Sequence, residues 1–190
     1  MNRFWRNRLG FVFFGVAAGL SGLAAWQHPS LLACLPALHN GLLAVLYLRR
    51  YPTVRYDRKG LYLGLLAAAL PTATPIPETP GLLPTLLALS GYAWILWSLL
   101  TLGNRFGIAP ADRGLVTSGP YRYVRHPMYL GELLLRGALV ASAPSLGMAL
   151  LLAGCLALIQ VLRILREERI IRGYPLYAAQ VRFRLLPGVW

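Results

Sequence analysis

Residues Leu9 to Trp26 read LGFVFFGVAAGLSGLAAW, a run of 18 residues without a charge. A helix of about 20 apolar residues crosses the hydrocarbon core of a bilayer, so this run predicts a transmembrane helix. Its Gly15, Gly19 and Gly22 form a face of small residues that suits close helix packing. Five further apolar runs follow along the chain, at Leu31–Leu48, Leu61–Ile76, Leu82–Leu102, Met128–Ala143 and Leu146–Leu165.

The composition favours a membrane protein over a soluble one. Hydrophobic residues make up 57% of the 190-residue chain and charged residues only 13%, against roughly 25% charged in an average soluble domain. The net charge is nevertheless +13, with 19 Lys and Arg against 6 Asp and Glu. A soluble nucleic-acid-binding protein carries such charge on a polar surface. No groove of interleaved aromatic residues is visible either, so we expect no nucleic-acid partner.

The distribution of basic residues between the loops predicts the topology. With six spans and a cytoplasmic N-terminus, the outer loops near residues 27–30, 71–81 and 143–145 contain no Lys or Arg. The arginine-rich segments then all face the cytoplasm, which is the positive-inside pattern. The third run is the weakest, because it is interrupted by Pro71, Pro75 and Pro77. Omitting it would place the two central basic segments on opposite sides of the membrane.

We therefore predict an all-α fold, a polytopic transmembrane bundle of about six spans with both termini in the cytoplasm. Pro144 marks a tight turn, so the last two spans should form a helical hairpin. We expect residues 1–190 to be a single integral membrane domain. Within it, residues 1–103 supply the N-terminal helices, and residues 104–190 supply a cytoplasmic loop, the hairpin and the tail. A signal peptide at the N-terminus is a less favoured alternative, because no clean cleavage site follows the first run.

A polar cluster interrupts the apolar runs at GPYRYVRHPMYLGE, residues Gly119 to Glu132. Pro127 suits the first position of a helix, where its missing N–H group costs nothing. The helix that begins there directs its N-terminal N–H groups and partial positive charge at Arg125 and His126. These three features together predict a site for an anion such as a carboxylate.

Two pairs of charged residues at i, i+4 spacing lie near or within predicted spans. Arg163 and Glu167 share a helical face at the cytoplasmic end of the last span, where ionisable groups mark candidate functional sites. The alternative is a pair of interfacial charges that snorkel. Glu132 and Arg136 form either an internal structural pair or a wall of the same cavity. Other arginines are interpreted individually as interfacial anchors: Arg105, Arg122, Arg172, Arg182 and Arg184.

Several motifs are absent from the sequence. No G-x-G-x-x-G follows a predicted strand, which argues against a Rossmann cofactor domain. No G-x-S-x-G is present, which argues against a serine hydrolase. The three histidines, His28, His39 and His126, are widely spaced, so we expect no metal site. Cys34 and Cys155 both lie in apolar runs, which suggests packing rather than a disulfide.

Two stretches resemble the isoprenylcysteine carboxyl methyltransferase family, which is similar to the membrane phospholipid methyltransferases. They are LVTSGPYRYVRHPMYLG (Leu115–Gly131) and REERIIRGYPLYAAQVRFRLLPGVW (Arg166–Trp190). The resemblance covers Asn104 to Trp190 and implies a membrane-integral methyltransferase that uses S-adenosylmethionine. It places the substrate-side arginine of the family at Arg163. It places the cofactor contacts at Leu115, Val116, Tyr121, His126, Pro127, Met128, Tyr129 and Glu167.

The chemistry of S-adenosylmethionine suits these residues. Its carboxylate needs cations or helix N–H groups, which Arg125 and His126 at the helix start offer. Its ammonium needs a carboxylate, which Glu167 offers. Arg163 can orient a carboxylate or phosphate of the acceptor by a bidentate contact, so we assign it the catalytic and substrate-binding role. The adenine needs apolar and aromatic walls, available from Leu115, Tyr121 and Tyr129.

The acceptor is expected to be lipophilic and to enter from the surrounding membrane lipid. A prenyl-type carboxylate, a phospholipid amine and a hydrophobic thiol remain open. We expect the protein in the plasma (inner) membrane of a prokaryote, with the active site facing the cytoplasm. One alternative is a membrane NADPH-dependent reductase of the sterol-reductase type, whose C-terminal layout is related. Another is a non-enzymatic membrane helper protein, which would not require two coordinated motifs.

Overall fold

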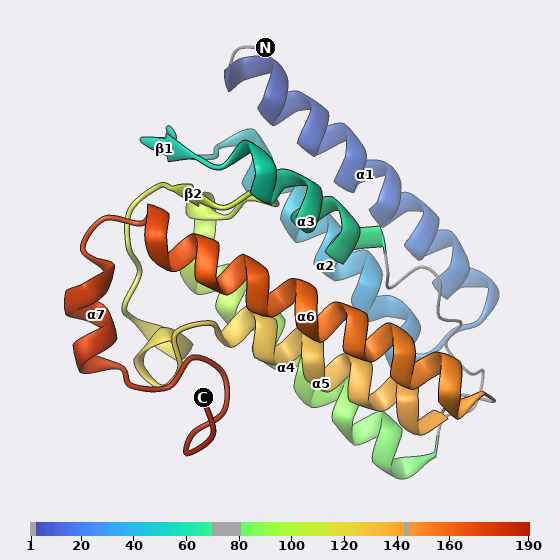
Figure 1. The fold of residues 1–190 in the computed structure, drawn as a ribbon. Helices are drawn as coiled ribbons and strands as arrows, with labels where there is room; N and C mark the ends of the chain where they lie inside the picture. The colour runs from blue at the N-terminus through green and yellow to red at the C-terminus, as the bar shows by residue number, and fades with distance from the viewer. Residues whose placement is uncertain (1–2, 70–80, 143–144) are drawn as a thin grey trace. The chain divides into compact units, whose positions relative to one another are not determined.

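The structure is a computed structural model that describes residues 3–69, 81–142 and 145–190. It is mostly helical (Figure 1), and one helix corresponds to each of the six predicted apolar runs. These are α1 (Arg3–Gln27), α2 (Leu31–Leu48), α3 (Arg58–Ala69), α4 (Leu82–Leu102), α5 (Pro127–Ser142) and α6 (Leu146–Ile170). A seventh helix, α7 (Tyr174–Gln180), lies in the C-terminal tail. The predicted all-α class is confirmed.

Four of these helices, α1, α2, α4 and α6, are long and apolar enough to cross a membrane. Helix α3 has 12 residues and α5 has 16, so both are shorter than these four. Helices α5 and α6 run side by side in opposite directions, as the predicted hairpin requires (Figure 1). The predicted end of the third run at Ile76 and the predicted turn at Pro144 lie outside the described residues.

The chain divides into two compact units, Met1–Pro52 with Leu102–Phe106 and Thr53–Thr101 with Gly107–Trp190. In the first unit α1 packs along α2. They approach closely at Gly10, where an added Cβ atom would lie 1.9 Å from Cδ1 of Tyr47. The predicted glycine face of α1 makes no such close contact within the described chain. Within the described chain, a Cβ atom would meet no heavy atom within 4 Å at Gly15, Gly19 or Gly22.

In the second unit, α4 and α5 meet through two glycines. A Cβ atom on Gly91 would lie 2.8 Å from the carbonyl oxygen of Gly131, and one on Gly131 would lie 2.6 Å from that of Gly91. Small residues let helices approach closely in a membrane, where van der Waals packing replaces the hydrophobic effect between helices. This contact holds the N-terminal part of α5 against α4. The predicted division of the chain at residues 103 and 104 stays a prediction.

A small element of sheet joins two loops of the second unit, which the sequence analysis did not predict. Strand β1 (Arg55–Tyr56) pairs antiparallel with β2 (Ala111–Asp112). Two short 3-10 helices complete the chain, η2 (Gly103–Arg105) in the first unit and η3 (Gly119–Arg122) in the second. The strand pair ties the loop before α3 to the loop that leads to the predicted polar cluster.

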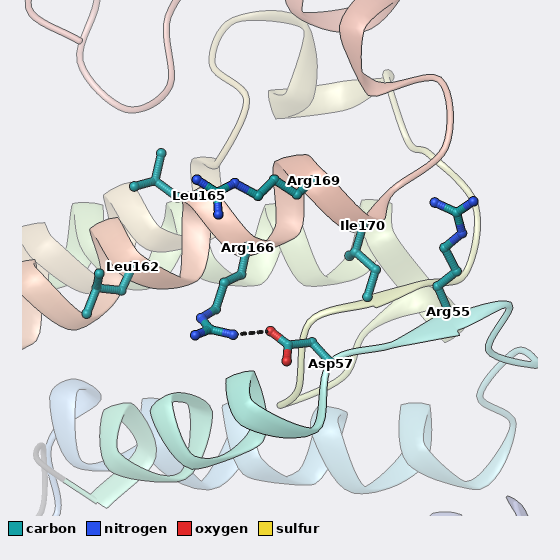
Figure 2. A pocket seen from close by; sticks show the side chains of 7 residues that line it. All are labelled: Arg55, Asp57, Leu162, Leu165, Arg166, Arg169 and Ile170. Carbon is teal, nitrogen blue, oxygen red and sulfur yellow. Dashed lines mark hydrogen bonds and ion pairs between the residues drawn. The ribbon is translucent and has the colours of Figure 1, made fainter.

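Asp57, which directly follows β1, ties α3 to α6. Its carboxylate accepts hydrogen bonds from the backbone N–H groups of Lys59 and Gly60, the usual arrangement of a helix N-cap. Arg166 of α6 donates to the same carboxylate at 2.8 Å (Figure 2). Burial alone would raise the pKa of Asp57, but these hydrogen bonds and the charge of Arg166 hold it below its ordinary value.

Candidate active site

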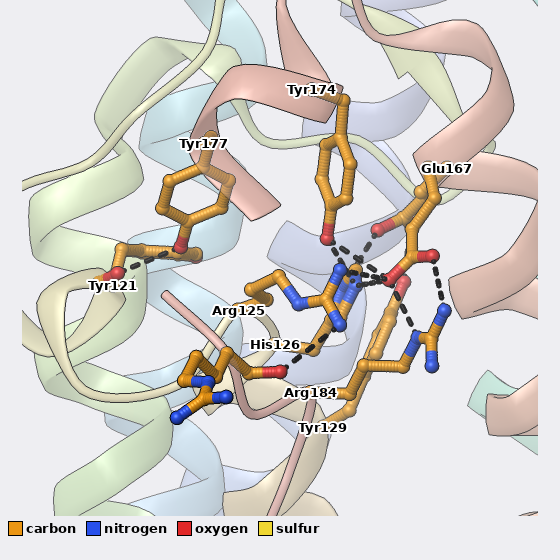
Figure 3. A network of polar contacts seen from close by, with 10 residues as sticks. Tyr121, Arg125, His126, Tyr129, Glu167, Tyr174, Tyr177 and Arg184 are labelled. Atoms are coloured by element: carbon orange, nitrogen blue, oxygen red, sulfur yellow. Dashed lines mark hydrogen bonds and ion pairs between the residues drawn. The ribbon is translucent and has the colours of Figure 1, made fainter. Parts of the chain in front are cut away.

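The predicted polar cluster lies in the second unit, where the start of α5, the end of α6, α7 and the C-terminal tail come together (Figure 3). The backbone N–H groups of Arg125 and His126 donate to the carbonyl oxygens of Phe183 and Arg184, both at 2.9 Å. The tail then turns back on itself, because the N–H group of Arg184 donates to the carbonyl oxygen of Trp190 at 2.8 Å. The two stretches that carry the predicted resemblance are therefore in direct contact.

Glu168 is the centre of an ionic network that holds these segments. Arg184 donates to both of its carboxylate oxygens, from Nε at 2.8 Å and from Nη2 at 2.9 Å. Nη1 of Arg125 lies 3.3 Å from Oε1, and the Tyr174 hydroxyl donates to the same oxygen at 3.2 Å. The hydrogen bonds to Glu168 raise the pKa of Arg184. Burial, followed by the charge of Glu168, raises the pKa of Tyr174.

Glu167, the preceding residue, has a different environment. The Tyr129 hydroxyl donates a hydrogen bond to its Oε1. Nδ1 of His126 lies 3.7 Å from its Oε2, and the His126 ring stacks on Tyr129 with centroids 5.7 Å apart. His126 is buried, and its Nε2 lies 2.9 Å from the Tyr174 hydroxyl. The structure thus brings together three of the predicted cofactor contacts, His126, Tyr129 and Glu167.

Arg163, one turn before Glu167 on α6, is buried inside the second unit. Its side chain is buried, with Nη1 donating to the side-chain oxygen of Gln160 and Nη2 to the carbonyl oxygen of Ile108, each at 3.2 Å. Its guanidinium carbon lies 4.7 Å from the centroid of the Tyr129 ring. Arg163 and Glu167 therefore meet through Tyr129, which contacts one with its ring and the other with its hydroxyl.

A hydrogen-bond chain extends from Arg163 toward the middle of α5. Gln160 accepts a hydrogen bond from Arg163 and donates one to the carboxylate of Glu132. Glu132 is thereby linked to Arg163 through a single side chain, and both interpretations of the pair Glu132 and Arg136 stay open. Gln160 is fully buried and was not among the predicted site residues.

The other predicted cofactor contacts lie on η3, at the start of α5 and on the loop between β2 and η3. The Tyr121 carbonyl accepts a hydrogen bond from the Tyr177 hydroxyl at 2.7 Å, which attaches η3 to α7. Burial raises the pKa of Tyr121, and the charge of Glu167 raises it further. Pro127 is buried at the first position of α5, and Met128 packs against an apolar core. That core comprises Val124, Tyr129, Leu130, Ile164 and Leu185.

Leu115 and Val116 lie half-buried on the loop between β2 and η3. Across the ranges that the structure describes, no hydrogen bond, ion pair or ring contact joins either residue to the cluster of Arg163, Glu167 and His126. Both stay predicted cofactor contacts.

Three residues of the network were not predicted as site residues: Glu168, Tyr174 and Arg184. Arg184 was interpreted as an interfacial anchor, but it is the main ionic partner of Glu168. The signal available in the sequence was the pair of adjacent carboxylates at 167 and 168, since a chain with 6 acidic residues in 190 seldom places two side by side. The pair could not show which carboxylate is structural.

The contacts of these two carboxylates answer that question. Glu168 is neutralised by Arg125 and Arg184, whereas in the described part of the chain Glu167 forms no ion pair with an arginine or lysine. A carboxylate of this kind, with a side chain 19% exposed beside aromatic rings, fits a cationic group such as an ammonium. No group of three or more His, Cys, Asp and Glu side chains within the described ranges could hold a metal ion.

Apolar helices long enough to cross a membrane, one of which, α6, ends in a buried cluster of ionisable side chains, define a polytopic membrane protein with a candidate active site. Residues 81–175, half of the chain, match the phospholipid methyltransferase family. The chain therefore belongs to this family and is a membrane methyltransferase. The family includes the isoprenylcysteine carboxyl methyltransferases, so the predicted resemblance is confirmed. No curated protein and no solved structure matches the chain.

Proposed function

We propose that the protein transfers the methyl group of S-adenosylmethionine to a lipophilic acceptor at the edge of the membrane. The observation that carries this proposal is the difference between two adjacent carboxylates. Glu168 is engaged by Arg125 and Arg184, while Glu167 accepts a hydrogen bond from Tyr129 and has no arginine or lysine partner within the described residues; His126 lies near both carboxylates.

Glu167 would hold the ammonium of the cofactor, and His126 with the N-terminal N–H groups of α5 would hold its carboxylate. Arg125 would attract the carboxylate of the cofactor only weakly, because Glu168 lies 3.3 Å from Arg125 and offsets its positive charge. When bound, S-adenosylmethionine supplies a methyl group that its sulfonium makes electrophilic. The apolar and aromatic walls would be Leu115, Val116, Tyr121, Pro127, Met128 and Tyr129.

Arg163 is the candidate catalytic residue on the acceptor side. Hydrogen bonds to Gln160 and Ile108 orient its guanidinium before the acceptor binds, so the acceptor does not have to order it. The planar fork of an arginine suits a carboxylate or a phosphate. A carboxylate acceptor would need no general base, whereas an amine must arrive neutral and a thiol must arrive ionised. The main contribution of Arg163 is therefore to position the acceptor.

The acceptor is a membrane-soluble molecule, because the cluster lies at the end of α6, a helix that can span a bilayer. A prenyl-type carboxylate, a phospholipid amine and a hydrophobic thiol are the three candidate classes. The positive-inside pattern supports a site on the cytoplasmic side of a prokaryotic plasma membrane, with both termini also in the cytoplasm.

The test is a pair of calorimetric titrations of the purified full-length protein in neutral detergent, one with S-adenosylhomocysteine and one with NADPH. We expect S-adenosylhomocysteine to bind and NADPH not to bind. His126→Ala should weaken the binding of S-adenosylhomocysteine about tenfold, the effect of losing roughly 1.4 kcal/mol of hydrogen bonding. His28→Ala, at an exposed position between α1 and α2, is the matched control and should bind normally.

A second experiment tests the transfer itself. The protein is incubated with a native lipid extract and S-adenosylmethionine labelled in its methyl group, and we expect label in the lipid fraction. Binding of NADPH alone would favour the reductase alternative. Binding of S-adenosylhomocysteine without any labelled lipid would contradict a lipophilic acceptor.

A further inference from the structure

A second candidate site lies on another face of α6, away from Arg163 and Glu167. A cavity of about 450 Å³ lies between the cytoplasm-facing end of α6 and the loop that carries β1 (Figure 2). All of its lining residues belong to the second unit. They are Arg55, Asp57, Leu162, Leu165, Arg166, Arg169 and Ile170.

The charges that line this cavity are unbalanced, with three arginines against one carboxylate. Asp57 is fully engaged, because it caps α3 and accepts a hydrogen bond from Arg166 at 2.8 Å. The side chains of Arg55 and Arg169 have no hydrogen-bond or ion-pair partner within residues 3–69, 81–142 and 145–190. Two arginine charges are thus available to an anion.

An apolar stripe leads from the cavity along α6. Leu151, Leu158 and Leu162 follow one another at i, i+7 and i+11, which places them on one helical face together with Leu165 and Arg169. Leu151 and Leu158 are each 60% exposed and Leu162 is 40% exposed. Since α6 can span a membrane, this face offers a path for a hydrocarbon chain that ends at the arginines.

We propose that this cavity binds the phosphate of an anionic phospholipid, with an acyl chain lying along the leucine stripe of α6. Arg55 and Arg169 supply the charge that recognises the phosphate, and Leu162 contacts the adjoining chain. Basic pockets beside membrane helices on the cytoplasmic side are suited to anionic head groups. This lipid is distinct from the methyl acceptor, because Leu162, Leu165 and Arg169 lie on a different face of α6 from Arg163 and Glu167.

The test is native mass spectrometry of the full-length protein in a neutral maltoside detergent. Dioctanoyl phosphatidylglycerol is the probe, because its head group contains no amine that a methyltransferase could modify. We expect one molecule to bind per chain, and dioctanoyl phosphatidylcholine to bind at least about tenfold more weakly. The double variant Arg55→Gln/Arg169→Gln should weaken phosphatidylglycerol binding about 10- to 30-fold, from about 1 kcal/mol per arginine.

Arg122→Gln/Arg182→Gln is the matched control, because it removes the same charge from two exposed arginines that do not line the cavity. It should change the affinity less than about threefold. Equal weakening by both double variants would overturn the proposal, since general attraction to a basic protein would then explain the binding. Unchanged affinity in Arg55→Gln/Arg169→Gln would overturn it as well.

Two further measurements distinguish a lipid from a free phosphate and guard against misfolding. Glycerol 3-phosphate, the head group without its chains, should not displace the lipid, and displacement at equal concentration would overturn the assignment to a lipid. Leu162→Gln leaves every arginine in place and should weaken binding about tenfold by removing an apolar contact. Normal lipid binding in this variant would contradict the position of the acyl chain.

Discussion

Replacing Glu168 by glutamine should destabilise the fold, whereas the same change at Glu167 should mainly weaken cofactor binding. Glu168 accepts two hydrogen bonds from Arg184, at 2.8 and 2.9 Å, and lies 3.3 Å from Arg125. Hydrogen bonds to charged groups contribute about 1.5–3 kcal/mol each. Because the Arg184 side chain is 26% exposed, solvent offsets part of the loss. We expect Glu168→Gln to lower the free energy of unfolding by about 2–4 kcal/mol.

Glu167→Gln removes a charge but keeps the contact that Glu167 makes within the fold. The amide oxygen of glutamine can still accept the hydrogen bond from Tyr129. We therefore expect the free energy of unfolding to change by less than about 1 kcal/mol. Loss of a charged partner in a partly desolvated binding site costs about 2–5 kcal/mol of affinity. Binding of S-adenosylhomocysteine should therefore weaken about 30- to 3,000-fold, nearer the lower figure because the site meets solvent.

Thermal unfolding in detergent and calorimetric titration with S-adenosylhomocysteine separate the two effects. For a protein of this size 1 kcal/mol corresponds to about 2–4 °C, so Glu168→Gln should lower the unfolding temperature by about 5–15 °C. Glu167→Gln should unfold near the wild-type temperature. Normal cofactor affinity in a folded Glu167→Gln protein would refute the assignment of Glu167. Wild-type unfolding of Glu168→Gln would refute its structural role.

Three further predictions concern the acceptor, the helix packing and the topology. Arg163→Ala should keep cofactor affinity within about threefold but lose turnover, measured as a raised KM, a lowered kcat or both. The unfolding temperature must show that the variant is folded. A loss of cofactor affinity as large as that of Glu167→Gln would contradict its acceptor role. Gly91→Ala should destabilise the protein by about 1–3 kcal/mol in thermal unfolding, because its Cβ atom would lie 2.8 Å from the carbonyl oxygen of Gly131. Gly137→Ala is the control and should not destabilise the protein, because its Cβ atom would meet no described heavy atom within 4 Å. The topology is tested in a protein that carries Cys34→Ser and Cys155→Ser. A cysteine introduced at His28 should react with an impermeant reagent added outside intact cells, and one introduced at Arg122 should react only after permeabilisation. The reverse pattern would overturn the predicted orientation.

The length and position of the helices could be predicted from the sequence because they depend on local hydrophobicity. The predicted runs Leu31–Leu48 and Leu82–Leu102 coincide with α2 and α4. Helix α6 instead continues five residues past the predicted Leu165, to Ile170. Hydropathy could not foresee this extension, because four of its five residues are charged. Contacts from outside the helix hold the extension. Arg166 donates a hydrogen bond to Asp57 in the loop after β1, and Glu168 accepts one from Arg184 in the C-terminal tail.

The sequence by itself determined which residue types gather at the site, since Arg125, His126 and Pro127 adjoin a helix start whose free N–H groups favour an anion. It could not assign different roles to Glu167 and Glu168. Adjacent residues on a helix point about 100° apart, so each meets different neighbours. Tyr129 lies 38 residues from Glu167, and Arg184 lies 16 residues from Glu168. Only the packing of α5, α6 and the tail brings these residues together, and that packing decides which carboxylate is neutralised by arginines and which has no arginine or lysine partner within the described residues.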